Sequence, residues 1–410
     1  MKKNILIIGN YPPPYGGVPV LVKSFSKYLQ SKNYNVFVLS GGTSGYEIID
    51  DVTIIKPGVI QRLFAIFSTL NVFRKILKTV PIYNLVKYPS FTLRLMSYSS
   101  IGYRLAKKND FEAIICYNLF NYGTIGYVIK SFCNNTRLIC CNFGEIHSHS
   151  DYPIIFKKLI SNTVNSIDVK VAGTKHCGNM YNILEKKYDY KIVDKKIKIV
   201  TPGVDLENFN LEKTEINVFL NKSKLSSKPH SILYLGRINS ELGVGVLLKV
   251  IEKIFSNADN VNSYNFTFVG QHGELAGDLK DIIKKFDNNV QYFENADLEL
   301  VKSSIVNSSF LVAPSLNDRA CGCLVASEAG ALNKTIIASR IGGIPEYVRD
   351  NYNGLLVNPN DVHDLFSKIK QLAENKDLLS KLENNNFINT SDYFNMKHHD
   401  KIYHSLINKI

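Results

Sequence analysis

Residues 3–39 read KNILIIGNYPPPYGGVPVLVKSFSKYLQSKNYNVFVL, and their pattern decides the fold class of the first half of the chain. The apolar run at 3–8 predicts a buried strand, and a loop rich in glycine and proline follows it. The amphipathic stretch 20–31 predicts a helix, and 35–39 predicts a second strand. A strand, a glycine-rich loop, a helix and a strand form the opening unit of a doubly wound parallel sheet.

The same alternation continues along the chain and restarts after a polar stretch at 204–230. Further strands are predicted in the first half at 113–116, 137–141 and 169–172, and in the second half at 232–235, 265–269, 290–293, 310–313 and 335–338. We therefore predict an α/β fold with two consecutive Rossmann-like doubly wound parallel-sheet domains and an interdomain cleft. Ligands are expected at the carboxyl ends of the strands.

The change in pattern sets the predicted domain bounds. An N-terminal domain covers 1–203 and a C-terminal domain covers 204–390. The remaining segment, 391–410, is predicted to hold a helix at 396–409 that follows an asparagine-rich linker. This helix is expected to cross back onto the first domain.

Composition excludes several other classes of protein. With 45% hydrophobic and 21% charged residues, the chain is close to the average of soluble globular proteins. Its seven cysteines are odd in number and scattered, so they predict neither a disulfide framework nor a zinc site. The first apolar run is too short for a signal peptide, and no run approaches the roughly 20 residues of a spanning helix. We expect a cytoplasmic protein, with any membrane contact peripheral.

The positive charge is concentrated in residues 55–110, a segment without a single acidic residue between Asp51 and Asp110. Aromatic residues are interleaved with its cations, and 63–76 are predicted to form one amphipathic helix. The cations are Lys56, Arg62, Arg74, Lys75, Lys78, Lys87, Arg94, Arg104, Lys107 and Lys108.

This mixture favours an anionic membrane surface, or a lipid-linked acceptor that carries phosphate, as the partner of the segment. A solvated basic face whose aromatics belong to the core is the plainer alternative. Nucleic acid is not expected as a partner, because no base-reading motif accompanies the charge.

Four residues have the chemistry to hold a nucleotide. Gly16 and Gly17 leave backbone N–H groups unshielded near the start of a helix, which suits an anion, although glycine pairs also mark ordinary turns. Arg237 follows a strand and could hold a diphosphate, or lie on the surface without a ligand. Glu328 follows a glycine-containing loop and could accept the hydroxyls of a ribose, or pair with a cation for structural reasons.

Taken together, the motifs closely resemble those of the retaining GT-B glycosyltransferases of the family 4 type, the glycosyl transferases group 1. The most specific are IIASRIGGIPE at 336–346, NGLLV at 353–357 and TPGVD at 201–205. The others are the PPxxGG loop at 12–17, GRI at 236–238, VG at 269–270, APS at 313–315 and EA at 328–329. They follow the order of the family and span nearly the whole chain, with 55–110 the least matched part.

The resemblance implies a retaining, metal-independent hexosyltransferase without a cofactor. The nucleotide-diphospho-sugar, linked to UDP or GDP, would bind the C-terminal domain, and a lipid-linked or glycan acceptor the N-terminal one. Glu328 would bind the ribose, Arg237 the diphosphate, and the N–H groups near Cys323 and Leu324 would face the phosphates, which the loop of Gly16 and Gly17 approaches. Such enzymes build bacterial surface polysaccharides, such as lipopolysaccharide, capsule or exopolysaccharide, at the inner face of the plasma membrane.

In the C-terminal domain the sequence departs from the family pattern at two positions. Ala320 stands where the family commonly has a second glutamate. Asp318 is predicted to take its place if the loop is two residues longer; alternatively, Arg319 indicates a sugar pocket of different shape. Leu242 stands where the family has a lysine that binds phosphate, and Lys249 or Lys253 on the next helix are possible replacements.

In the N-terminal domain, Phe143 stands where the family often has a histidine close to the sugar. Glu145 and His147 follow it and are predicted to act on the acceptor side, although each could equally be incidental. Because three expected groups are missing, a non-catalytic GT-B binding or scaffolding protein stays open as the alternative function.

Overall fold

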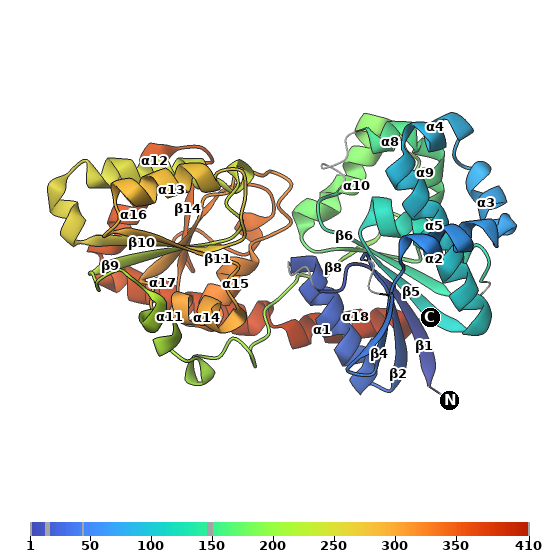
Figure 1. Ribbon diagram of the computed structural model, residues 1–410, viewed down its shortest axis with the longest axis horizontal. Coiled ribbons are helices and arrows are strands. Elements are labelled where there is room, and N and C mark those ends of the chain that lie inside the picture. Colours follow the sequence, from blue (N-terminus) through green and yellow to red (C-terminus); the bar gives the residue numbers. More distant parts are fainter. Residues whose placement is uncertain (1, 13–16, 43–44, 134, 146–150, 409–410) are drawn as a thin grey trace. The chain divides into compact units, whose positions relative to one another are not determined.

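The computed structural model describes residues 2–12, 17–42, 45–133, 135–145 and 151–408. The chain forms two compact units, each built on its own parallel sheet (Figure 1). Unit 1 contains Met1–Thr201 and His399–Ile410, and unit 2 contains Pro202–His398. The predicted fold class, α/β with two Rossmann-like doubly wound domains, is confirmed.

The sheet of unit 1 has eight strands in the order β3-β4-β2-β1-β5-β6-β7-β8. They are β1 (Lys3–Ile8), β2 (Tyr34–Leu39), β3 (Gly45–Ile49), β4 (Val52–Lys56), β5 (Phe111–Tyr117), β6 (Arg137–Asn142), β7 (Val169–Ala172) and β8 (Ile197–Ile199). All neighbours are parallel except β3, which runs antiparallel to β4 at the edge. The strand order reverses beside β1, and right-handed crossovers then place helices on both faces of the sheet.

Four helices of unit 1 lie in the chain between β4 and β5. They are α2 (Val59–Phe67), α3 (Leu70–Leu77), α4 (Ile82–Lys87) and α5 (Pro89–Lys108). The prediction of one helix over 63–76 is wrong, because α2 ends where the Ser68 hydroxyl donates to the Phe64 carbonyl at 2.6 Å and the Thr69 hydroxyl to the Ala65 carbonyl at 2.8 Å. Such local hydrogen bonds compete with continuation of the helix.

The sheet of unit 2 has six parallel strands in the order β11-β10-β9-β12-β13-β14. They are β9 (His230–Leu235), β10 (Tyr264–Gly270), β11 (Val290–Glu294), β12 (Phe310–Ala313), β13 (Ile336–Ser339) and β14 (Leu355–Val357). The helices that follow strands include α12 (Val244–Phe255), α13 (Ala276–Lys285), α14 (Leu298–Val306), α15 (Leu324–Ala331) and α16 (Val362–Glu374). The order is that of the dinucleotide-binding fold, with its switch point between β9 and β12.

The segment predicted as an asparagine-rich linker is instead helix α17 (Lys376–Tyr393). Asn386, on this helix, is buried and donates to the carbonyls of Ala326 and Lys334 at 3.0 and 2.8 Å. Its own amide oxygen accepts a hydrogen bond from Asn353 at 3.0 Å. These tertiary contacts stabilise a helix that asparagine by itself disfavours.

The last helix, α18 (Met396–Asn408), begins in unit 2 and continues into unit 1. It packs beside α1 (Gly17–Ser31), where Tyr403 lies 5.3 Å from Phe25 between ring centres and Asp400 accepts a hydrogen bond from Ser24 at 3.0 Å. The hydroxyl of Tyr403 lies 2.7 Å from the Cys141 sulfur on β6. None of the described helices is long and apolar enough to cross a membrane.

Candidate functional site

The candidate site lies in unit 2, where the carboxyl ends of β9 and β12 diverge at the switch point of the sheet. Residues 236–243 follow β9, and residues 314–323 follow β12. In open parallel sheets, ligands bind outside the carboxyl ends of the strands at this point, because the two loops turn to opposite faces and leave room between them.

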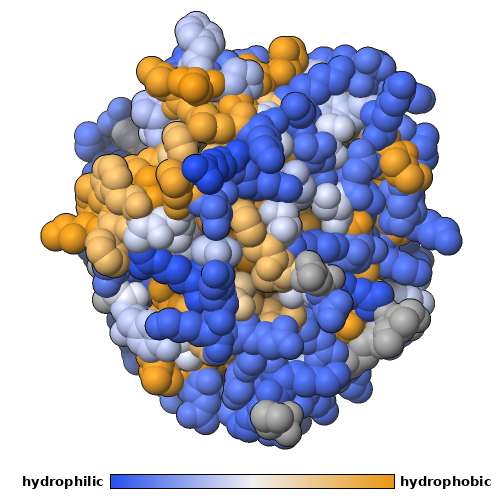
Figure 2. All heavy atoms as spheres, turned by 90° about the vertical axis from the view of Figure 1, so that its right-hand side faces the viewer, coloured by the Kyte–Doolittle hydropathy of each residue, from blue (hydrophilic) through white to orange (hydrophobic). Residues whose placement is uncertain are grey.

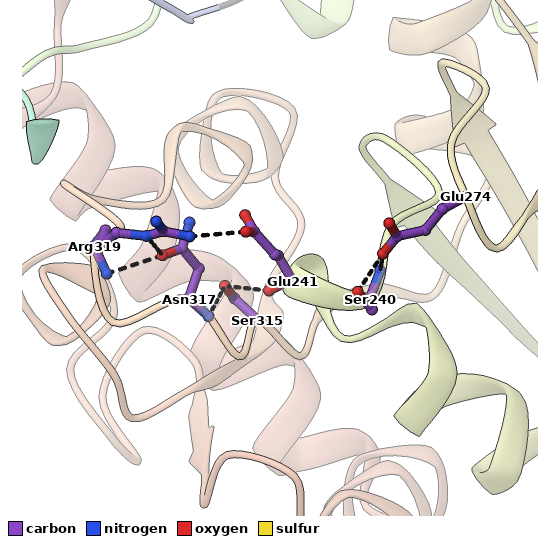
Figure 3. A network of polar contacts seen from close by, with 6 residues as sticks. All are labelled: Ser240, Glu241, Glu274, Ser315, Asn317 and Arg319. Atoms are coloured by element: carbon purple, nitrogen blue, oxygen red, sulfur yellow. Dashed lines mark hydrogen bonds and ion pairs between the residues drawn. The ribbon is translucent and has the colours of Figure 1, made fainter. Parts of the chain in front are cut away.

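Polar contacts join the two loops directly (Figure 3). The guanidinium of Arg319 donates to the Glu241 carboxylate at 2.7 Å and to the Asn317 amide oxygen at 3.1 Å. The backbone N–H of Leu316 donates to the Glu241 carbonyl at 2.8 Å. On the other side, the backbone N–H of Ser240 donates to Glu274, in the loop after β10, at 3.0 Å. The loops after β9, β10 and β12 therefore form one connected edge.

Glycines allow this close approach. Gly243 has a φ of 75°, and a Cβ atom on it would lie 1.7 Å from the Pro314 carbonyl oxygen. A Cβ atom on Gly270, at the end of β10, would lie 1.9 Å from the Gly236 carbonyl oxygen. Both contacts are between backbones, so they cannot relax by a change of rotamer.

Arg237 is an exposed cation at this edge. Its backbone carbonyl accepts a hydrogen bond from the Tyr234 hydroxyl at 2.7 Å, which holds the turn after β9. Its guanidinium makes no hydrogen bond or ion pair with any described residue. It is therefore available to an anion such as a diphosphate.

Glu328 is a partly buried carboxylate on α15, the helix that follows the β12 loop. It forms neither an ion pair nor a hydrogen bond within the described part of the chain. Burial raises the pKa of its carboxyl group to about 7. An ionisable group in this condition is typical of a binding or catalytic site rather than of a structural ion pair.

The start of α15 offers backbone donors to the same edge. Cys323 is the N-cap residue and makes no side-chain cap, while burial raises the pKa of its thiol to about 12. Leu324 is the first residue of the helix, so its N–H has no partner within the helix. A neutral thiol and unused N–H groups leave this end of the helix suited to a negatively charged ligand.

The residues predicted to replace the missing glutamate and lysine of the family lie in different surroundings. Asp318 is exposed on the β12 loop, beside Arg319. The Lys253 ammonium lies 4.8 Å from the centre of the Phe366 ring on α16. Lys249 is exposed earlier on α12, and Leu242 packs against the hydrophobic core.

In unit 1, Glu145 lies at the carboxyl ends of β5 and β6. Its carboxylate is buried and accepts hydrogen bonds from the N–H of Leu119 at 2.5 Å and of Phe143 at 2.8 Å. Burial raises the pKa of Glu145, although the backbone donors oppose this. The two carboxylate oxygens of Glu145 therefore connect the loop after β5 with the loop after β6.

Two predicted residues, Gly16 and His147, lie outside the described residues. Gly17 is described, and it is the exposed first residue of α1. Phe143, at the position where the family often has histidine, stacks on Tyr117 with 6.1 Å between ring centres. The histidine position is therefore occupied by a packed aromatic ring.

No sequence pattern indicates the residues that hold the site together. Glu241 and Arg319 are 78 residues apart, and nothing in either segment indicates the other. Tyr347 was also missed: its hydroxyl donates to the Pro202 carbonyl at 2.9 Å, and a Cβ atom on Gly322 would lie 2.1 Å from its ring. Only a glycine at 322 lets the β12 loop pass over this ring.

Known proteins match the fold of the chain and the sequence of much of unit 2. An Anabaena protein, HepE, solved in complex with UDP, superimposes with a TM-score of 0.71 at 14% identity over 100% of both chains. The chain therefore has the fold of GT-B proteins. Residues 216–387, within unit 2, match the family model described as glycosyl transferases group 1, and this match confirms the resemblance of the motifs to that group.

Two sequence relatives extend this finding. An uncharacterized glycosyltransferase of Methanocaldococcus jannaschii is 27% identical over 323 residues, which cover 75% of this chain and 87% of the relative. An uncharacterized 41.2 kDa protein in the cps region of Klebsiella pneumoniae is 27% identical over 254 residues, 54% of this chain and 67% of that protein.

Proposed function

We propose that this protein transfers a hexose, with retention and without a metal ion, from a UDP- or GDP-linked sugar to a lipid-linked or polysaccharide acceptor. The proposed setting is the synthesis of bacterial surface polysaccharide, at the inner face of the plasma membrane. One observation carries the proposal. Arg237 and Glu328, a cation and a carboxylate without partners among the described residues, belong to the loops or helices after the two strands of the switch point.

Each group has a proposed task at the donor. Arg237 binds the diphosphate, and the N–H groups at Cys323 and Leu324 face it from the helix start. Glu328 accepts the ribose hydroxyls. Departure of a nucleoside diphosphate develops negative charge, and fixed donors and cations of this kind stabilise it. Gly16 and Gly17 stay proposed as donor-binding residues.

Asp318, Glu145 and His147 are the residues proposed around the transferred sugar and the acceptor. Asp318 is exposed on the β12 loop and is assigned to the transferred sugar. Glu145 uses both carboxylate oxygens on backbone N–H groups, so it is better suited to hold the loops after β5 and β6 than to contact the acceptor. His147 stays assigned to the acceptor.

The comparisons support parts of this proposal. The HepE structure contains UDP, which is a product of transfer from a UDP-sugar. The Klebsiella relative is encoded in a cps region, which supports a role in surface polysaccharide. Both facts concern those proteins, and they favour the corresponding donor and pathway here.

A non-catalytic scaffolding GT-B protein is the second proposal. It is favoured by Leu242, which packs against the hydrophobic core and stands where the family has a phosphate-binding lysine, and by Ala320. Loss of a charge-assisted hydrogen bond costs about 1.5–3 kcal/mol, which lowers donor affinity but does not abolish it.

Calorimetric titration with UDP and with GDP distinguishes the two proposals. The full chain is compared with Arg237→Ala, Glu328→Ala and, as a control, Lys376→Ala. Lys376 is the first residue of α17, and its charge is felt by His230. His230 is the first residue of β9, so it lies at the end of that strand opposite to the candidate site. We expect one nucleotide to bind, roughly ten- to hundredfold more weakly in the two site variants, and unchanged in the control. Absence of binding at millimolar nucleotide would contradict the donor site and favour the scaffold.

A further inference from the structure

Helix α2 points an apolar stripe into solvent. Ile60, Leu63, Phe64 and Phe67 are spaced as positions i, i+3, i+4 and i+7, so they share one helix face. All four are exposed, and Ile60 and Phe67 are each 84% exposed. The only fully buried residue of α2 is Ala65. An amphipathic helix of a globular protein normally turns such a stripe toward the core.

Helix α4 repeats this feature on a smaller scale. Ile82, Tyr83 and Val86 are all exposed, while Leu85 anchors the helix in the core. Leu70, between α2 and the body of α3, is exposed as well. We call these eight side chains, on α2, Leu70 and α4, the apolar face.

The apolar face is held firmly by the fold. The Thr69 hydroxyl donates to Ser100 on α5 at 2.5 Å, and the Thr92 hydroxyl of α5 donates to the Leu85 carbonyl at 2.6 Å. The Asn84 amide donates to the Ile155 carbonyl at 2.8 Å. Both helices therefore rest on α5, and their exposure does not result from missing tertiary contacts.

Cations accompany the apolar face. Arg104 lies 5.0 Å from the Phe64 ring centre, and Lys87 lies 5.8 Å from that of Tyr83. Of the ten cations in 55–110, only the buried Lys56 has a carboxylate partner among the described residues, Glu47 at 3.7 Å. Figure 2 shows hydrophobic side chains gathered on this side of unit 1 next to strongly hydrophilic ones.

Two interpretations of residues 55–110 are open from the sequence: a membrane-binding surface, or a solvated basic face whose aromatic residues belong to the core. Some aromatic residues of this segment fit the first and others fit the second. Phe91 and Tyr98 are buried, as expected for a solvated basic face over core aromatics. Phe64, Phe67 and Tyr83 are exposed, as expected for a surface that enters a lipid headgroup layer. The exposed members are those on α2 and α4.

We infer that the apolar face is a docking surface for an anionic lipid bilayer. The side chains of α2 and α4 enter the boundary between headgroups and acyl chains, and the unpaired cations bind the lipid phosphates. The absence of carboxylates from this segment favours a bilayer, because a protein partner would usually meet charges of both signs. The link between this docking surface and a lipid-linked acceptor rests on the proposed function.

Vesicle sedimentation tests the surface. The full chain is mixed with vesicles of neutral phosphatidylcholine, or with the same lipid containing anionic phosphatidylglycerol, at low and high salt. We expect binding to anionic vesicles that weakens with salt, since surface charges are screened. The double variant Ile60→Ser/Phe67→Ser should bind at least about tenfold more weakly, because two large apolar side chains no longer leave water.

The control is Tyr46→Ser/Ile48→Ser, which removes two exposed apolar residues from edge strand β3, outside the apolar face. Equal loss in both double variants, or binding that ignores lipid charge and salt, overturns the inference. A dimer in sedimentation that Ile60→Ser/Phe67→Ser dissociates would assign the face to a second copy instead. UDP and GDP titrations of the same samples separate the two proposals, because nucleotide binding does not require the apolar face.

Discussion

At the scale of single residues, Glu328 is the most informative group. A structural glutamate inside a protein is normally paired, because an uncompensated buried charge costs free energy. Glu328 has no such pair among the described residues, and its pKa of about 7 reflects this uncompensated burial. A ligand that donates hydrogen bonds, such as a ribose, would relieve the cost.

Glu328→Gln should therefore stabilise the free protein in a pH-dependent way. Since the carboxyl pKa rises from 4.5 unfolded to about 7 folded, the wild type loses stability as pH rises through this range and reaches its full penalty above about pH 7. We expect the variant to gain up to roughly 3 kcal/mol in free energy of unfolding at pH 8 and almost nothing at pH 4.5. Urea unfolding at both pH values measures this.

The same variant should bind the nucleotide more weakly at pH 8, although it is more stable. If the variant and the wild type differed in free energy of unfolding by the same amount at pH 4.5 and at pH 8, burial of Glu328 would not perturb the pKa of its carboxyl group. Stabilisation together with unchanged nucleotide affinity would remove Glu328 from the site.

Sequence motifs predicted Arg237 and Glu328 as site residues, Arg237 from its place after a strand and Glu328 from the family resemblance. They did not locate the partners of Arg319 or the direction of Lys253. Arg319 meets Glu241 only because β9 and β12 are neighbours in the sheet. Lys253 lies over Phe366 because α12 and α16 pack together.

At the scale of elements, the site depends on close main-chain contacts between neighbouring loops. The turn before α12 contacts the loop after β12 at Gly243 and Pro314, and the end of β10 contacts the turn after β9. Because these contacts involve main-chain atoms, they fix where Arg237 and the β12 loop lie relative to each other.

Gly243→Ala should disturb this arrangement. The new Cβ atom would lie 1.7 Å from the Pro314 carbonyl oxygen, and a φ of 75° is itself unfavourable for alanine. We expect a loss of about 2 kcal/mol or more in free energy of unfolding and weaker nucleotide binding. Urea unfolding and calorimetry measure the two effects.

Gly277→Ala on α13 is the matched control, because nothing lies within 4 Å of its new Cβ atom. Alanine is the better helix former, so this variant should be neutral or slightly stabilised. Equal effects of both substitutions would mean that the contact at Pro314 can relax.

Element boundaries were predicted less well than element types. The sequence pattern of 63–76 has helical periodicity throughout, but hydroxyls of Ser68 and Thr69 end α2 early. The asparagines near 386 disfavour a helix locally, but buried hydrogen bonds to Ala326 and Lys334 stabilise one. In both places, hydrogen bonds decided whether the helix continued. Sequence periodicity does not contain information about these hydrogen bonds.

At the scale of the whole molecule, α18 makes the chain end on the unit in which it began. Arg137 of β6 donates to the carbonyls of Leu406 and Ile407 at 2.9 and 3.2 Å, near the end of the helix. Tyr403 is completely buried between α1 and the sheet. Unit 1 therefore needs the last residues of the chain to complete its core.

Tyr403→Ala should destabilise unit 1 by about 3–5 kcal/mol, because a large aromatic side chain leaves a cavity. Tyr393→Ala, at the exposed end of α17, should change stability by less than about 0.5 kcal/mol. Thermal or urea unfolding followed by a probe in each unit measures the effect. A loss confined to unit 2 would contradict the packing of α18 on unit 1.

The sequence by itself determined the fold class and the two Rossmann-like units. It could do so because apolar periodicity and glycine position are local properties of the chain. Only the tertiary structure decided that Glu241 holds Arg319, that Glu145 is used on backbone donors, and that α2 and α4 expose their apolar side chains. These outcomes depend on which elements become neighbours, and no periodicity within one segment contains that information.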